Sequence, residues 1–266
     1  MKIVLNHCLT FLTILVTGGA SELAIQKTVL TNSSPSTLQA ISILNEEVAW
    51  VSGYAATFAR TEGGGENWES FTHPEGTLQF CDIHAFDESN IILMSAGLGE
   101  SSRIYLFDAQ SAEFTEVYVM PHPEGFLNTI ELWDDLSGLA FGDSVNRELF
   151  ILKTTDGGSS WYRIDPNKLP EAGQGEGGFA ADGTCISIQP DGNAWIATGA
   201  GGHSRILHTS DYSETWAEYP NPIIKGAAAG FVSINMLNLE MGVIVGGDLA
   251  NKDDYTDNVA LTTDGG

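Results

Sequence analysis

The chain has 266 residues, of which 35 are acidic and 11 are basic, so its formal net charge is −24. Binding to nucleic-acid phosphates or to anionic membrane surfaces needs clustered Lys and Arg, and the composition argues against both kinds of partner. The acidity itself is typical of a soluble surface whose copies repel one another, and it does not indicate a particular ligand.

The first twenty residues have the pattern of a targeting segment. Lys2 precedes an apolar core, and the small residues Gly18 and Ala20 occupy positions −3 and −1 before a cleavage site. We expect residues 1–20 to be a signal peptide, the mature protein to be exported to the periplasm or the cell exterior, and residues 21–266 to form one domain. The alternative is an N-terminal membrane anchor, for which the apolar run is short.

A turn sequence recurs along the rest of the chain. The stretch KTTDGGSSW at 153–161 has near-copies at 60–68 and 208–216, and LTTDGG occupies 261–266. The aspartate position of this turn falls at Gly63, Asp108, Asp156, Asp211 and Asp264, with intervals of 45, 48, 55 and 53 residues. Such a period is typical of a propeller blade or a solenoid unit.

Each repeat also contains the same series of short apolar runs. One β-branched run carries an isoleucine, and a second run ends in glycine; the isoleucines are Ile41, Ile83, Ile130, Ile186 and Ile234. With a strand before and after the turn, each repeat has four short strands and no helical period. The sequence therefore predicts an all-β fold, a β-propeller of four-stranded blades.

Five repeats are visible, and the fifth lacks its last strand. We expect the natural chain to continue past Gly266, because an open ring would expose sheet edges, and the complete protein to have six or seven blades. Residues 22–31 are expected to supply the outer strand of the final blade.

The pattern Ser/Thr-x-Asp-x-Gly-x-x-Trp in these turns resembles the Asp-box, or bacterial neuraminidase repeat, of sialidase-like propellers. The matching residues are Thr154, Asp156, Gly158 and Trp161, then Thr209, Asp211 and Trp216, then Asp264, and Trp68 in a copy where Gly63 replaces the aspartate. The spacing also resembles bacterial propellers of the photosystem II stability and assembly factor-like group. Both resemblances cover nearly all of the mature chain and imply the propeller fold.

These turns, called box turns below, are expected to be structural. An Asp carboxylate can accept hydrogen bonds from backbone N–H groups of its own turn, glycine takes the positive-φ position, and tryptophan covers the hairpin. A catalytic aspartate would not need a copy in every blade.

The variable connections lie at the opposite ends of the strands and predict a loop face where a ligand would bind. The longest connection spans residues 165–184. The candidate ligand-binding residues on this face or near the channel are Asp82, His84, Asp143, Arg147, Glu176, His203 and Asp248. Each has a simpler interpretation: an aspartate after glycine commonly caps a turn, and a histidine on a strand or loop can serve packing or solvation.

The sequence contains few residue patterns that would indicate a metal or a cofactor. Asp253, Asp254 and Asp257 could chelate calcium but lack the ordered EF-hand spacing. Cys81 and Cys185 lie in separate repeats and are expected to be buried thiols rather than a disulfide or a metal site. We expect no cofactor, since motifs for flavin, haem, quinone or nicotinamide are missing.

The expected function is that of an exported, monomeric, non-catalytic binding or assembly module with a protein or glycan ligand on the loop face. The alternative is a glycoside hydrolase that uses a carboxylate pair. A sialidase would need three arginines around the substrate carboxylate, and only Arg147 of the five arginines is predicted on the loop face.

Overall fold

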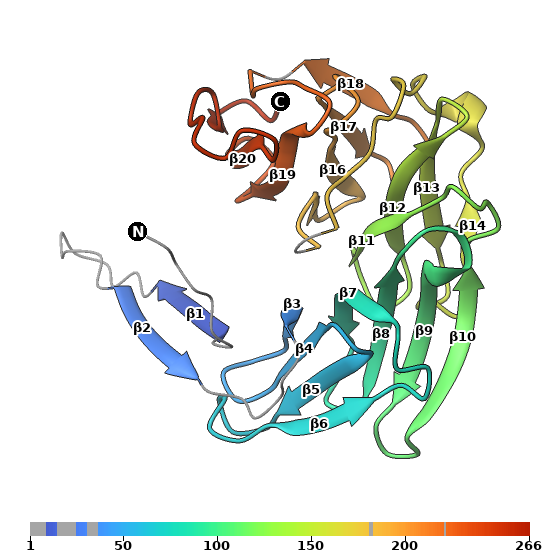
Figure 1. Cartoon of the computed structure of the whole chain (residues 1–266), viewed down its shortest axis with the longest axis vertical. Coiled ribbons are helices and arrows are strands. Elements are labelled where there is room, and N and C mark those ends of the chain that lie inside the picture. The colour runs from blue at the N-terminus through green and yellow to red at the C-terminus, as the bar shows by residue number, and fades with distance from the viewer. Residues whose placement is uncertain (1–8, 15–24, 31–36, 181–182, 221) are drawn as a thin grey trace.

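The computed structural model describes residues 9–14, 25–30, 37–180, 183–220 and 222–266 (Figure 1). In these residues four four-stranded antiparallel sheets and one three-stranded sheet follow one another in chain order. Figure 1 shows them along an arc, with the first strand of each sheet toward the centre. The predicted propeller of four-stranded blades is confirmed, and the fifth blade has three strands within this chain.

The elements of the blades share one order, from the central strand to the outer strand. Blade one has β3 (Leu38–Ile43), β4 (Ala49–Gly53), β5 (Thr57–Thr61) and β6 (Glu69–Thr72); blade two has β7 (Gln79–Ala85), β8 (Asn90–Ala96), β9 (Arg103–Asp108) and β10 (Glu113–Val119). Blade three has β11 (Leu127–Leu132), β12 (Gly138–Val145), β13 (Glu148–Thr154) and β14 (Tyr162–Arg163); blade four has β15 (Ile186–Gln189), β16 (Asn193–Ala197), β17 (Arg205–Ser210) and β18 (Ala217–Pro220). Blade five has β19 (Ala229–Met236), β20 (Gly242–Asp248) and β21 (Val259–Thr262); two 3-10 turns span Gly99–Ser101 and Pro166–Lys168.

A separate pair of strands precedes the blades. β1 (Leu9–Ile14) and β2 (Ile25–Leu30) form a two-stranded antiparallel sheet, so β2 pairs with β1 in this chain and not with the fifth blade. Of the predicted signal peptide, only 9–14 lies within the described residues. No helix in the described part of the chain is long and apolar enough to cross a bilayer.

The core lies between the blades. In β8, Ile91 and Leu93 pack in the core shared with blade one, whereas Ile92 and Met94 pack in the core shared with blade three. Successive residues of a strand point to opposite faces, and both faces of blade two are covered by its neighbours. The middle of β8, residues 91–94, is therefore a continuous apolar run without polar alternation.

The blades also share a register. The five inner isoleucines face Val51, Leu93, Ala140, Ile196 and Ile244 of the second strands. Neighbouring inner strands are joined by side-chain hydrogen bonds: Ser42 Oγ accepts from Ala85 N–H at 3.0 Å and Ser187 Oγ from Met236 N–H at 2.9 Å. Each inner strand thus places equivalent residue positions toward the centre of the propeller. Residues at the same position can therefore be compared between blades.

The box turns are held by hydrogen bonds of their own residues. Thr154 Oγ1 accepts from Gly158 N–H at 2.9 Å, and Asp156 Oδ1 accepts from Ser160 N–H at 2.9 Å. Trp161 is buried at 8% exposure in the core between blades two and three. The turn at 209–216 repeats this geometry, with Thr209 Oγ1 accepting from Ser213 N–H at 3.0 Å.

Cys81 and Cys185 are both buried, and no disulfide joins them. Burial raises the pKa of the Cys81 thiol well above its usual value. Both residues therefore serve as small apolar side chains of the core.

Candidate functional site

The long connection between blades three and four organises the predicted loop face. Its backbone pairs with the loops on both sides: Ser144 N–H donates to Glu176 O at 2.9 Å, and Gly177 and Gly199 exchange two backbone hydrogen bonds at 3.0 and 2.8 Å. Residues 176–177 of the connection are therefore seated between the end of β12 and the β16–β17 loop. The polar contacts of this connection determine which side chains of the loop face remain free to bind a ligand.

Asp143 is one of the groups that hold this connection. Its Oδ1 accepts from Asn128 Nδ2 at 2.8 Å and from Gly178 N–H at 3.2 Å. Burial raises the pKa of the Asp143 carboxyl above its ordinary value, while the two donors act in the opposite direction. The predicted ligand-binding residue thus lies on the loop face, but it bonds to the protein itself.

Glu176 is bonded still more completely. Its carboxylate is fully buried and accepts from Arg205 Nε at 2.8 Å and Nη2 at 2.9 Å, and from Thr198 Oγ1 and Gly173 N–H at 2.8 and 2.7 Å. A buried carboxylate is tolerated when a cation and further donors satisfy it. The Glu176–Arg205 pair therefore fixes the connection to blade four.

Two further predicted residues also lie against the connection. Arg147 forms an exposed ion pair with Glu171, Nη2 to Oε1, at 2.9 Å. His203 is exposed, and its ring covers Gly173 so closely that a Cβ there would lie 2.1 Å from His203 Cγ. Four predicted residues, Asp143, Arg147, Glu176 and His203, are thus brought together by one segment.

Asp248 lies apart from this group. It ends β20, and its Oδ1 accepts from Ala250 N–H at 2.8 Å, the turn-capping geometry described above. In the neighbouring loop, Asp254 caps its own turn by accepting from Thr256 N–H at 2.9 Å. In the described part of the chain no three His, Cys, Asp or Glu side chains gather to form a metal site.

Asp82 and His84 lie on β7, beside the channel. Asp82 is buried, and its Oδ2 accepts from Ile130 N–H at 2.7 Å and from Thr129 Oγ1 at 3.0 Å. Burial raises its pKa well above the ordinary value. His84 is half-buried against Phe86, with the ring centroids 5.2 Å apart, and burial lowers its pKa. Asp82 thus joins blade two to blade three.

The inner strands carry a polar position that the sequence analysis did not identify. The residue after each inner isoleucine is polar in all five blades: Ser42, His84, Glu131, Ser187 and Asn235. Glu131 is the acidic member, and burial raises its pKa to about 7. Alignment of the five repeats on their isoleucines was the signal that could have found it.

Glu131 borders a pocket, called the box-side pocket below, with a volume of about 580 Å³. It is lined by residues 131–134 of blade three, residues 186–191 and Tyr212 of blade four, and Asn235 and Met236 of blade five. It opens at the box-turn ends of the strands, because 134, 191 and 212 are turn residues. A concave pocket that contains a carboxyl with a perturbed pKa is the default candidate for a functional site.

Aromatic side chains form one wall of this pocket. The rings of Trp133 and Tyr212 have centroids 5.4 Å apart. Trp133 Nε1 donates to Asn193 O at 2.8 Å, and Tyr212 N–H donates to Gly192 O at 3.1 Å. Both residues are therefore anchored on the same β15–β16 turn, and the wall is preformed.

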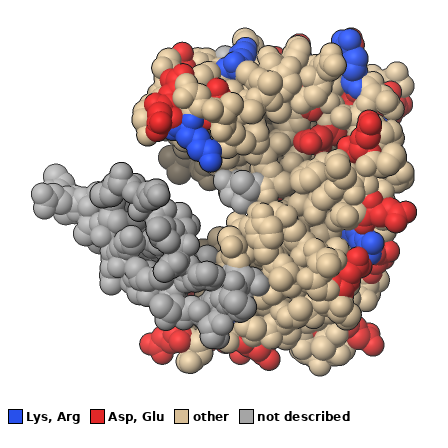
Figure 2. All heavy atoms as spheres, in the orientation of Figure 1, with Lys and Arg blue, Asp and Glu red and all other residues tan. Residues whose placement is uncertain are grey.

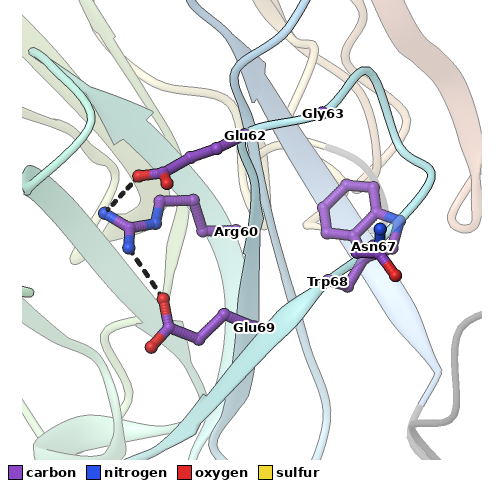
Figure 3. Close-up of a pocket in the computed structure, with 6 residues that line it drawn as sticks. All are labelled: Arg60, Glu62, Gly63, Asn67, Trp68 and Glu69. Carbon is purple, nitrogen blue, oxygen red and sulfur yellow. Dashed lines mark hydrogen bonds and ion pairs between the residues drawn. The ribbon is translucent and has the colours of Figure 1, made fainter.

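A second pocket, of about 380 Å³, lies at the first box turn (Figure 3). Arg60 lies between two glutamates there, with Nη1–Glu62 Oε1 at 3.0 Å and Nη2–Glu69 Oε2 at 2.7 Å. Nη1 also donates to Glu88 O at 2.6 Å. Because the protein itself already engages this guanidinium, the pocket is a weaker candidate than the box-side pocket.

The first box turn lacks the carboxylate that the others have, and restoring it is expected to stabilise the protein. Asp156 and Asp211 each accept an N–H from the residue four positions later, and Gly63 has no such acceptor for Asn67. A Cβ at Gly63 meets nothing within 4 Å. Gly63→Asp should add about 1 kcal/mol to the free energy of unfolding, measured by urea titration.

The matched control for this substitution is the reverse change, Asp156→Gly, which should destabilise the protein by a similar amount. Equal stability of Gly63→Asp and the wild type would contradict the assigned role of the carboxylate in the box turns.

Comparisons with known proteins support the fold. No family model matches the chain, and no curated protein matches it. Among solved structures, it is similar to YCF48 bound to D1 peptide, with 14% identity over 87% of this chain and 70% of that chain, at a TM-score of 0.55. It is also similar to the GH74 xyloglucanase from Xanthomonas campestris, with 12% identity over 86% of this chain and a TM-score of 0.61, but it spans only 37% of that enzyme. At these identities the similarity establishes the propeller fold.

Proposed function

We propose that this chain is a non-catalytic binding module whose ligand is a basic polypeptide. The observation that carries the proposal is the engagement of the loop-face carboxylates. Asp143 and Glu176 both bond to the protein's own backbone and side chains, and Asp248 caps its own turn. A hydrolase needs two carboxyl groups presented to the substrate, whereas these three groups build the scaffold.

The charge distribution supports a cationic ligand. Each of the five arginines is paired with at least one glutamate; they are Arg60, Arg103, Arg147, Arg163 and Arg205. Acidic side chains therefore dominate the surface charge, and Figure 2 shows them around the rim of a face whose middle is largely uncharged. Such a field attracts positively charged partners and repels negative ones.

The polypeptide class has support from the fold neighbours. The similar YCF48 structure is described as bound to a peptide, so a propeller of this shape can take a polypeptide ligand. This is an argument by analogy between folds, and the charge and the pocket of this chain provide the independent support.

A glycoside hydrolase is the second candidate, and Glu131 is the observation that favours it. A carboxyl group with a pKa of about 7 suits a general acid, and Asp134 and Asp191 line the same pocket. The similar GH74 structure is a xyloglucanase, which is consistent with this alternative at the level of the fold.

A binding screen run beside a panel of chromogenic glycosides tests the proposal. We expect the protein to bind labelled basic peptides in preference to acidic peptides and glycans, with an affinity that falls at least severalfold between low salt and about 0.5 M salt. No glycoside should be turned over. If the wild type hydrolyses a glycoside and Glu131→Gln does not, the protein is a glycoside hydrolase and the proposed binding function is wrong.

A further inference from the structure

We propose that the box-side pocket holds one lysine or arginine side chain of the basic polypeptide, an inference that rests on the proposed function. Its geometry combines acidic groups, an aromatic wall and a depth that includes the inner strands. These features recognise a long side chain with a cationic end.

The side chains that line the box-side pocket include acidic groups. Glu131, Asp134 and Asp191 contribute three carboxylates, and the described residues that line the pocket include no Lys, Arg or His. The nearby cation Lys153 donates to Tyr212 O at 2.5 Å and is paired with Glu214 at 3.1 Å, so its charge is locally balanced. A donor-rich positive group is therefore the chemical complement of this lining.

The aromatic wall suits the same ligand. The rings of Trp133 and Tyr212 can cover the apolar stem of a long side chain, and their faces attract an ammonium or guanidinium group. Gly192 makes room for this wall, because a Cβ there would lie 2.6 Å from Tyr212 Cδ2. The wall is set by backbone packing and needs no rearrangement to receive a ligand, which reduces the entropy lost on binding.

The position of Glu131 makes it the residue that decides specificity. Asp134 and Asp191 are exposed turn residues, and Asp134 Oδ1 already accepts from Leu136 N–H and Ser137 N–H at 2.8 and 2.7 Å. Glu131 lies deeper, on the inner strand β11. A cation that reaches Glu131 interacts where the effective dielectric constant is low, so its attraction is stronger than at the rim.

Binding is then coupled to the ionisation of Glu131. The titratable groups near it are acidic: Asp82 on β7, whose own pKa is raised by burial, Asp134 in the turn after β11, and Asp191 in the turn after β15. Since its pKa is about 7, Glu131 is largely neutral below pH 6 and ionised above pH 8. A bound ammonium or guanidinium favours the ionised form, so affinity should rise with pH across this window.

Fluorescence anisotropy with labelled nonalysine and nonaarginine peptides tests the inference on the full chain, at about pH 8 and about 0.1 M salt. Glu131→Gln should weaken binding of at least one peptide by about tenfold or more, because it removes the buried charge without changing the side-chain shape. The matched control is Glu124→Gln, an exposed glutamate between β10 and β11 on the loop face, which loses the same charge and should change binding less than about twofold.

A second variant and a pH series give independent readouts. Tyr212→Asn keeps a residue that tolerates the positive φ of +56° and removes the ring, so binding should weaken by about two- to fivefold. Wild-type affinity should fall by about tenfold from about pH 8 to about pH 6, and this dependence should vanish in Glu131→Gln.

The outcomes separate the inference from the proposed function. A wild-type protein that binds neither peptide overturns both. A wild-type protein that binds, while Glu131→Gln binds as tightly as Glu124→Gln, overturns the pocket assignment and leaves the binding function standing. Circular dichroism on every variant shows that the fold is retained.

Discussion

Replacing Arg205 with methionine is expected to destabilise the protein by about 3–5 kcal/mol. The substitution removes two donors from the fully buried Glu176 carboxylate and leaves a negative charge in the core without its cation. Burial of an uncompensated charge is one of the few single changes with an effect of this size. The consequence should spread to the long connection, because Glu176 also receives Gly173 N–H at 2.7 Å.

Urea unfolding followed by tryptophan fluorescence measures this effect. The matched control is Arg147→Met, which breaks the exposed pair with Glu171 and should cost no more than about 1 kcal/mol. Combining Arg205→Met with Glu176→Gln should recover a large part of the loss, because the amide carries no charge to bury. Similar losses in Arg205→Met and Arg147→Met would show that the buried pair does not hold the connection.

Replacing Glu131 with glutamine is expected to stabilise the protein in alkaline solution. The pKa of Glu131 is raised by burial from 4.5 to about 7, so the folded state favours the protonated form. The contribution of Glu131 to the free energy of unfolding is fully present below pH 4.5, the pKa of the group in the unfolded chain. It is lost as the pH rises through about 7, the pKa of the group in the folded protein. Glu131→Gln avoids this loss and should be more stable than the wild type by about 3 kcal/mol above pH 8, with little difference near pH 4.

The measurement is the free energy of unfolding of both proteins across this pH range. Glu124→Gln serves again as the control, because an exposed glutamate should leave the pH dependence unchanged. If the free energy of unfolding depends on pH in the same way in Glu131→Gln and in the wild type, then burial of the Glu131 carboxylate does not destabilise the protein. A stabilising substitution that also abolishes peptide binding would identify Glu131 as a residue kept for function.

The fold could be predicted from the sequence because each blade repeats its own local signals. A turn such as 154–158 forms from its own residues, and the glycine-ended strands and inner isoleucines recur with it. Local bonds of this kind leave a recognisable pattern that recurs along the chain, even where Gly63 replaces the aspartate. The blade boundaries then follow without any knowledge of contacts between blades.

The site could be predicted only in part. The loop-face position of Asp143 and Glu176 follows from the strand order, but their partners Gly178 and Arg205 depend on the path of one irregular connection. Irregular backbone leaves no periodic signal. Glu131 was missed for a different reason: its environment is created by the next blade, and no single repeat contains both sides of the pocket.

Three hydrogen bonds between inner strands run in the same direction. Ser42, Asp82 and Ser187 each belong to the earlier blade and accept an N–H from the blade that follows in the chain. A blade that has already folded therefore offers its acceptor before the next inner strand has been synthesised. The chain can add blades one at a time as it leaves the ribosome, each blade serving as the template for the register of the next.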